Sequence, residues 1–172
     1  MKTIVFLAVA LLTIHTSFSQ SAEVSRDASG NKILKGFMSK KDLTSDTAFL
    51  WFTENQKGYT PDPNTLLALK NNKDSINIIA FGGTWCSDTK NILPKFFLLS
   101  DLAGFPQDRV ILLGVDRSKK TIQHLSEAFH ITHVPTLIVM KNGREVGRVV
   151  EYGKYGLFDK ELGEIISNSG KK

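Results

Sequence analysis

Four stretches of the chain have the apolar pattern of β-strands. Ser75–Gly82 and Val110–Val115 are nearly continuous apolar runs, which is typical of strands covered by helices on both faces. Thr136–Met140 and Arg144–Glu151 flank Asn142–Gly143, a favoured two-residue turn, and therefore predict a β-hairpin. The pattern thus predicts a buried central sheet that ends in an antiparallel pair.

The segments around these strands have the periodicity of helices. Helices are predicted over 45–56, 63–72, 88–102, 122–129 and 158–167. Asp62 is a suitable N-cap with Pro63 at the first helical position, and Thr121 is a suitable N-cap for the helix over 122–129. An order of strand, helix, strand, helix, then hairpin and helix is typical of a three-layer α/β domain.

The first 36 residues differ from the rest of the chain. Residues 1–19 have the pattern of a secretory signal peptide, because Lys2 precedes the apolar run Ile4–Ile14 and small residues follow it. The run is shorter than the ~20 apolar residues of a spanning helix, so we expect no stable membrane insertion after cleavage. We expect an exported protein, located in a bacterial periplasm, with a flexible N-terminal arm at 20–36 and one domain at 37–172.

Charge and composition narrow the range of partners. The chain has 22 Lys and Arg against 17 Asp and Glu, a formal net charge of +5. The basic residues are dispersed and lack interleaved aromatic side chains, so nucleic acid is not an expected partner. The single cysteine and scattered histidines have no metal-ligand spacing, and we expect neither a metal nor a cofactor.

The only cysteine, Cys86, lies between the strand at 75–82 and the helix at 88–102. At a helix N-terminus the helix dipole and the free backbone N–H groups favour the thiolate, which is the reactive form. The alternative is a buried cysteine that acts as a small hydrophobe. A lone cysteine in an exported chain cannot form an internal disulfide, which indicates intermolecular pairing or a reactive site.

Two motifs extend the interpretation of this cysteine. Trp85-Cys86-Ser87-Asp88-Thr89-Lys90, followed by Pro94, resembles the active-site segment of the thioredoxin family, Trp-Cys-x-x-Cys-Lys. The segment 133–137, His-Val-Pro-Thr-Leu, together with the hairpin after it, resembles the cis-proline loop of that family. The resemblance implies a thioredoxin-like three-layer fold, with a central mixed β-sheet flanked by helices.

The resemblance also implies roles for individual residues. Cys86 would be the catalytic nucleophile of thiol–disulfide exchange, and the bond before Pro135 would be cis. The substrate would be contacted by Trp85, Asp88, Thr89, Val134 and Pro135, with the backbone of Val134 pairing with an extended peptide. Trp85 could equally be a packing residue. His133 is a candidate modulator of the Cys86 thiolate. The negative charge of Asp88, if it lies nearby, would oppose the ionisation of Cys86.

Two positions depart from the family pattern and leave three interpretations open. Thr89, whose hydroxyl could hydrogen-bond the Cys86 sulfur, replaces the second cysteine that releases the substrate, and Ala80 replaces a buried acid. The first interpretation is a monothiol protein, whose Cys86 forms mixed disulfides with substrate proteins or small thiols that an external thiol reductant resolves. The second is a non-catalytic peptide- or protein-binding module. The third, peroxide reduction, lacks the Pro-x-x-x-Thr-x-x-Cys pattern of peroxiredoxins.

Overall fold

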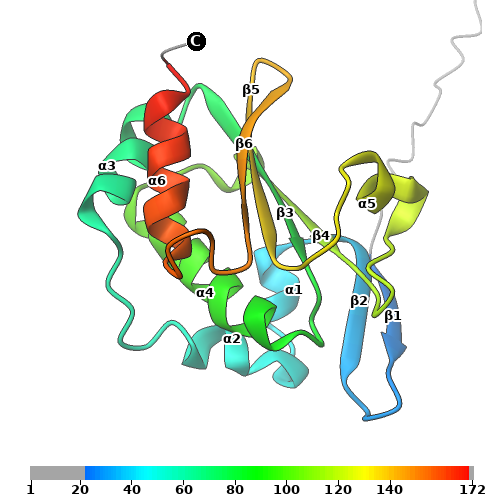
Figure 1. Cartoon of the computed structure of the whole chain (residues 1–172). Helices are drawn as coiled ribbons and strands as arrows, with labels where there is room; N and C mark the ends of the chain where they lie inside the picture. Colours follow the sequence, from blue (N-terminus) through cyan, green and yellow to red (C-terminus); the bar gives the residue numbers. More distant parts are fainter. Residues whose placement is uncertain (1–21, 171–172) are drawn as a thin grey trace, which may run out of the picture.

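A single mixed sheet runs through the protein, whose computed structural model describes residues 22–170 (Figure 1). The signal peptide expected at residues 1–19 lies outside the described residues. The strands are β1 (Glu23–Arg26), β2 (Lys32–Met38), β3 (Ile76–Gly82), β4 (Val110–Gly114), β5 (Thr136–Lys141) and β6 (Arg144–Val150). Their order in the sheet is β1-β2-β4-β3-β5-β6. β3 and β4 are parallel, and the other neighbouring pairs are antiparallel.

Helices cover both faces of this sheet. The α-helices are α1 (Lys40–Thr44), α2 (Trp51–Glu54), α3 (Pro63–Asn72), α4 (Ser87–Leu102), α5 (Leu125–Ala128) and α6 (Phe158–Asn168). Short 3-10 helices are η1 (Thr47–Phe49), η2 (Gln107–Arg109) and η3 (Ile122–His124). Figure 1 shows α3, α4 and α6 on one face and α5 on the other. The predicted three-layer α/β fold with a central mixed sheet is therefore confirmed.

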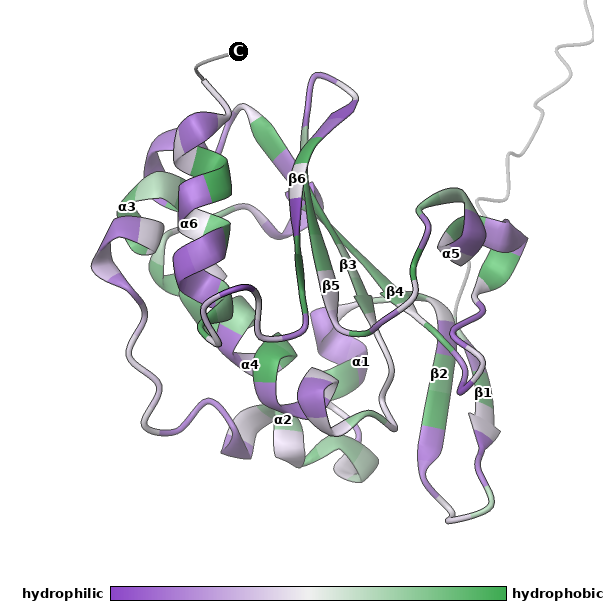
Figure 2. Cartoon of the chain, in the orientation of Figure 1, coloured by the Kyte–Doolittle hydropathy of each residue, from purple (hydrophilic) through white to green (hydrophobic). Residues whose placement is uncertain are grey.

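The central strand β3 contributes to a hydrophobic core on each face. Ile76, Ile78 and Ala80 pack into the core under α3, α4 and α6, while Ile79 and Phe81 pack into the core on the α5 side. This division follows from the two-residue period of a strand, which sends successive side chains to opposite faces. Figure 2 shows the resulting apolar centre along the inner strands, with hydrophilic residues on the helices around it.

The segment expected to be a flexible arm is instead part of the sheet, as far as it is described. Residues 23–26 and 32–38 form the hairpin β1–β2, and β2 pairs with β4 from Gly36↔Gly114 to Met38↔Leu112. Asp27 builds the turn, because its carboxylate accepts hydrogen bonds from the backbone N–H groups of Ser29 and Asn31, both at 2.9 Å. The expectation of an arm was wrong because the apolar run in β2 is short and is interrupted by Gly36.

Gly114 allows the hairpin to approach the rest of the sheet. A Cβ atom at this position would lie only 2.2 Å from the carbonyl oxygen of Leu34. Side chains cannot be accommodated at such a distance, so the pairing of β2 with β4 depends on a glycine here.

Two predicted helices are shorter than their patterns suggested. The segment 45–56 forms η1 and then the single turn of α2, not one helix. The segment 122–129 is interrupted, because Gln123 and His124 have φ angles of 50° and 55°. Thr121 does not cap it either, since its hydroxyl donates a hydrogen bond to the carbonyl of Gly114 at 2.7 Å.

A proline inside α4 fixes the position of the segment after α2. Pro94 has no N–H, so it cannot donate to the carbonyl of Lys90 one turn earlier. The side-chain amide of Asn55 supplies the missing donor at 2.8 Å, and the amide of Gln56 donates to the carbonyl of Pro94 at 3.1 Å. Residues 55 and 56 are therefore attached to the middle of α4.

We expect Asn55→Ala to lower the free energy of unfolding by about 0.5–1.5 kcal/mol, because it leaves the Lys90 carbonyl without a donor. Urea denaturation measures the change. In a Pro94→Ala background residue 94 regains its N–H, so the same substitution should cost clearly less. Equal costs in the two backgrounds would contradict this explanation.

Candidate functional site

Cys86 is the N-cap residue of α4, directly after β3. Its N–H donates to the carbonyl of Gly83 at 2.8 Å, and its own carbonyl accepts from Lys90 N–H at 3.0 Å in the first turn of the helix. The side chain is half-buried, so the sulfur is partly open to solvent. Its thiol donates a hydrogen bond to the carbonyl of Val134 at 3.2 Å, whereas the sulfur accepts no hydrogen bond from the helix N–H groups.

The loop before β5 holds the acceptor for this thiol. Val134 and Pro135 are both buried, and the peptide bond between them is cis. The carbonyl of Pro135 accepts from Glu151 N–H at 2.7 Å, and the hydroxyl of Thr136 donates to the carbonyl of His133 at 2.8 Å. The loop is therefore fixed on both sides of Val134, and the carbonyl of Val134 points toward Cys86.

Trp85 is held in place by three contacts. Its indole N–H donates to the carbonyl of Val115 at 3.0 Å, and the guanidinium of Arg117 lies 5.1 Å from the ring centroid. The ring also lies over Gly83, where a Cβ atom would come within 2.7 Å of it. Because Trp85 remains half-exposed, it is a packing residue and also keeps a surface beside Cys86.

The β1–β2 hairpin supports the loop between β3 and α4 that carries Cys86. The sequence did not predict this contact. The buried hydroxyl of Thr84 donates to the carbonyl of Lys32 at 2.8 Å. Arg117, the residue that covers Trp85, forms an ion pair with Asp27 in the β1–β2 turn at 2.5 Å. The hydrogen bond from Arg117 and those from Asn31 lower the pKa of Asp27 from 3.8 to about 2.

Thr89 does not have the role that its place in the motif implied. Its side chain is only 1% exposed, so it offers no surface to a substrate. Its hydroxyl accepts a hydrogen bond from Gly83 N–H at 3.1 Å. The hydroxyl therefore bonds to the loop before the cysteine and not to the Cys86 sulfur. A threonine in the first turn of α4 thus fixes the glycine segment that precedes the cysteine.

Three further residues were singled out in the sequence, and only one of their side chains, that of Asp88, has a polar contact near the site. Asp88 is half-buried and accepts a hydrogen bond from the phenol of Tyr152 at 3.4 Å. His133 is exposed, and its Nδ1 is 3.0 Å from the hydroxyl of Thr132, so its hydrogen bond is not directed at Cys86. Ala80 is fully buried in the hydrophobic core under the helices.

Tyr152 was not predicted, although it is part of the same surface. It follows β6 and bonds to Asp88. Burial, the negative charge of Asp88 and the hydrogen bond to it raise the pKa of the Tyr152 phenol, which therefore remains a neutral donor. A single tyrosine after a strand has no sequence pattern that would mark such a contact.

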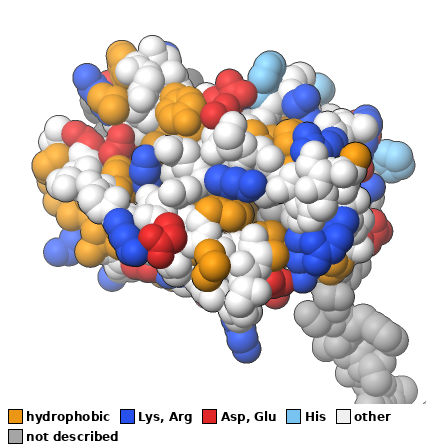
Figure 3. All heavy atoms as spheres, turned by 90° about the horizontal axis from the view of Figure 1, so that it is seen from below, with side chains coloured by type: hydrophobic (Ala, Val, Ile, Leu, Met, Phe, Trp, Pro, Cys, Tyr) orange, Lys and Arg blue, Asp and Glu red, His pale blue; other side chains and the backbone are white. Residues whose placement is uncertain are grey.

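Hydrophobic and charged side chains share the end of the molecule at which α4 begins. Figure 3 shows this end, where hydrophobic side chains lie among Lys and Arg side chains together with Asp and Glu side chains. Within residues 22–170, no group of three or more His, Cys, Asp and Glu residues is placed to hold a metal ion. None of the helices in this part of the chain is both long and apolar enough to cross a membrane.

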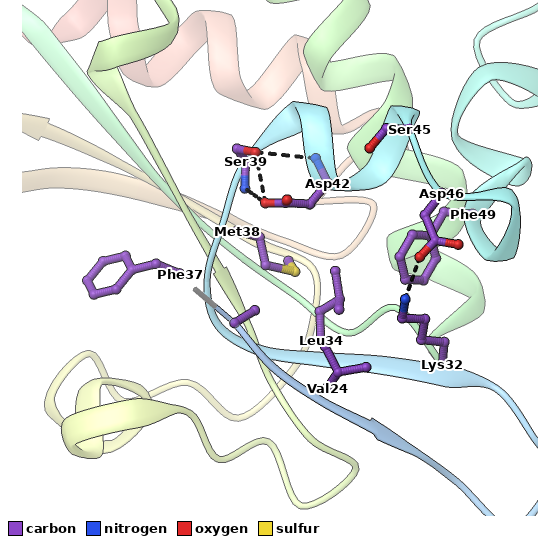
Figure 4. Close-up of a pocket in the computed structure, with 11 residues that line it drawn as sticks. Val24, Lys32, Leu34, Phe37, Met38, Ser39, Asp42, Ser45, Asp46 and Phe49 are labelled. Atoms are coloured by element: carbon purple, nitrogen blue, oxygen red, sulfur yellow. Dashed lines mark hydrogen bonds and ion pairs between the residues drawn. The ribbon is translucent and has the colours of Figure 1, made fainter. Parts of the chain in front are cut away.

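Two cavities are large enough for a ligand. One, of about 530 Å³, lies between the β1–β2 hairpin and the segment α1–η1, and Figure 4 shows the Lys32–Asp46 ion pair at its side. None of its lining residues belongs to the Cys86 site. The other, of about 480 Å³, is bounded by Tyr152 and therefore adjoins that site.

The family model described as thioredoxin matches residues 65–160, and the chain belongs to the thioredoxin family. It is 33% identical over 84 residues to a thioredoxin of Echinococcus granulosus, covering 49% of this chain and 73% of that protein. It is 31% identical over 103 residues to thioredoxin H2-2 of Oryza sativa subsp. japonica, covering 59% and 71%.

A crystal structure of an HIV epitope scaffold superposes with a TM-score of 0.50 at 14% identity, covering 77% of this chain and 99% of that one, which supports the fold alone. Membership of the family supports a general function in thiol–disulfide redox chemistry.

We expect acid to loosen the contact between the hairpin and Trp85. The pKa of Asp27 is lower in the folded chain, so its ionised form stabilises the fold above about pH 4, and this stabilisation is lost as the pH falls toward 2. The fluorescence of Trp85, recorded in a Trp51→Phe variant, should change across this range. A matched Asp27→Asn variant should show the altered emission already at neutral pH. Identical titrations of the two proteins would contradict the coupling.

Proposed function

We propose that the chain is an exported monothiol thioredoxin-like protein that acts in thiol–disulfide exchange through Cys86. The observation that carries this proposal is the position of the sulfur, which is partly exposed at the start of α4 and 3.2 Å from the carbonyl of Val134. A thiol at this place can lose its proton to solvent and attack a sulfur atom from outside.

The first step joins the substrate to the protein. The Cys86 thiolate attacks one sulfur of a substrate disulfide, the substrate S–S bond breaks, and the other substrate sulfur leaves as a thiolate. The product is a mixed disulfide at Cys86. The substrates are proteins or small thiols in their disulfide form.

The second step needs a thiol from outside the chain. Cys86 is the only cysteine in the sequence, and the buried Thr89 takes the place of the residue that would attack from within. An external thiolate attacks the substrate sulfur, forms a new disulfide with it, and releases Cys86 as the thiolate. Reduction of the substrate then requires a second external thiol, while Cys86 returns unchanged.

The carbonyl of Val134 supports binding of an extended peptide. In the free protein this carbonyl accepts the Cys86 thiol proton. The thiolate and the mixed disulfide carry no such proton, so the carbonyl becomes free to accept a backbone N–H of the substrate. Trp85 is partly exposed and offers a contact surface next to Cys86, whereas Pro135 is buried and fixes the loop that carries the Val134 carbonyl. Binding through main-chain hydrogen bonds tolerates different substrate sequences.

A second candidate function is a binding module without redox turnover. It is favoured by one observation, the absence of both the second cysteine at Thr89 and a buried acid at Ala80. In this case Cys86→Ser would bind a partner peptide as tightly as the wild type, because the serine hydroxyl can also donate to the Val134 carbonyl. Loss of binding in this variant would argue against the module.

The proposed location, a bacterial periplasm, is supported by the pattern of residues 1–19. If the proposal is right, the protein recovered from a periplasmic fraction should begin close to residue 20. N-terminal sequencing of the recovered protein makes this measurement. A chain that retains its first residues in the cytoplasmic fraction would contradict export.

Exchange itself is tested with a model disulfide. The reduced wild type should form a mixed disulfide at Cys86, detected by intact mass, and added thiol should remove it. Cys86→Ser should form none and should lose all activity above the rate of the external thiol alone. Full activity in Cys86→Ser would overturn the exchange function.

A resolving cysteine can be restored as a matched test. Residues 86 and 89 are neighbours on one helix face, so Thr89→Cys places a second thiol next to the mixed disulfide. This variant should release bound substrate without external thiol and form an 86–89 disulfide, at a cost of about 1 kcal/mol for the lost bond to Gly83. Release that still depends on external thiol would show that the helix tip does not support exchange.

A further inference from the structure

A pocket of about 480 Å³ lies on the surface beside the Cys86 site, and we call it the Tyr59 pocket. It opens between the segment after α2, one side of α4 and the loop from β6 to α6. Its lining residues are Lys57, Gly58, Tyr59, Thr60, Asn91, Lys95, Tyr152, Gly156, Leu157, Phe158 and Asp159. Residues 57–60 precede residues 65–160, which match the thioredoxin family model, so one wall of this pocket lies outside the matched part of the chain.

Fixed contacts build the wall that residues 57–60 provide. Asn55 and Gln56 attach the preceding residues to the backbone of α4. The ring of Tyr59 stacks on Phe158 with centroids 6.1 Å apart, and its phenol donates to Asp159 at 2.8 Å. The pocket is thus shaped in the free protein and requires no ordering of its wall on binding.

The pocket is close enough to Cys86 for one ligand to reach both. Tyr152 lines it and bonds to Asp88, two residues after the cysteine. Asn91 lies five residues after Cys86, which is about 7–8 Å along the axis of α4. A strand rises about 3.3 Å per residue, so two or three extended residues span this distance.

The charges around the pocket favour an anionic ligand. Its one acid, Asp159, already accepts hydrogen bonds from Tyr59, from Asp62 N–H and from Lys160 N–H. Lys95 bonds to the side chain of Asn91 at 2.8 Å, and it forms no ion pair with a carboxylate of residues 22–170. Lys95 therefore leaves a positive charge at the rim.

The mouth of the pocket is also apolar. Leu157 is 56% exposed and Tyr152 is 39% exposed, and both line the pocket. Tyr155, in the same loop, is also exposed. Large apolar side chains gathered on one short segment beside a reactive sulfur indicate a surface that is covered when a ligand binds.

We propose that the Tyr59 pocket binds the polypeptide that is joined to Cys86, by taking a large apolar side chain two or three residues from the substrate cysteine, while a neighbouring carboxylate pairs with Lys95. This proposal rests on the proposed exchange function and names its substrate class. The preferred substrates are proteins with an apolar–acidic pair close to the cysteine.

The test uses two series of synthetic peptides, in which each peptide has one cysteine activated as its mixed disulfide with 2-nitro-5-thiobenzoate. The Cys86 thiolate attacks the peptide sulfur, and the coloured thiobenzoate leaves as a thiolate. One series carries Phe-Glu and the other Ala-Lys, at spacings of one to three residues on either side of the cysteine. Each rate is divided by the rate of iodoacetamide alkylation, which removes any difference in the reactivity of the sulfur.

At its best spacing, the Phe-Glu peptide should react about tenfold faster than the Ala-Lys peptide. A difference of this size is expected from the partial burial of one aromatic side chain and the formation of one ion pair. Lys95→Glu should abolish this preference, whereas Lys90→Glu, an equal charge change on the same helix but outside the pocket, should keep it. Leu157→Ser removes an exposed apolar side chain at the N-cap of α6, so it should fold normally and weaken the preference for the Phe-Glu peptide without abolishing it.

The outcomes separate the two proposals. Equal normalised rates for the two series would overturn the Tyr59 pocket and leave exchange standing. If neither series exchanges, the exchange function is overturned, and fluorescence anisotropy of the unactivated labelled peptides with Cys86→Ser then decides the pocket. Equal affinities in that measurement would overturn it.

Discussion

The missing N–H of Pro94 is the constraint on which the arrangement around the active helix depends. It leaves the Lys90 carbonyl inside α4 without an intrahelical donor, and the side chain of Asn55 replaces that donor from another segment. The missing hydrogen bond within one helix is thereby replaced by a hydrogen bond from a different segment of the chain. Through it, residues that precede the family match are held against α4, and they reach α6 through the contact between Tyr59 and Asp159.

The Cys86 site is similarly assembled from segments far apart in the sequence. The cysteine loop provides the sulfur, the Pro135 loop provides its acceptor, and the β1–β2 hairpin holds Thr84 and, through Asp27, Arg117. The family match does not include the hairpin. A protein with one thiol cannot complete an exchange cycle alone, so in the proposed function this chain positions the thiol and binds the substrate that reacts with it.

Much of this could be predicted from the sequence, because strong periodicity and turn residues determine the central strands, α3, α4, α6 and the β5–β6 hairpin. The placement of Cys86 at a helix tip also followed from its neighbours. The pairing of the β1–β2 hairpin with β4 and the contact of Tyr152 with Asp88 could not be predicted, since each depends on a partner distant in the chain. The burial of Thr89 was missed because a polar residue in the first turn of a helix has no pattern that marks it as buried. The resemblance gave Thr89 a substrate role, but its hydroxyl supports the loop.

The two outermost strands of the sheet show how such a protein avoids pairing with itself. A chain proposed to bind extended peptides by backbone pairing could also be recruited by other copies along an open sheet edge. β1 has only four residues and carries Glu23 and Arg26, while β6 carries Arg144, Glu145 and Arg148. A short edge strand on one side and a charged edge strand on the other both disfavour edge-to-edge aggregation. Under the proposed function, the Val134 loop is then the place where an extended chain pairs with this protein, so backbone association is confined to the surroundings of Cys86.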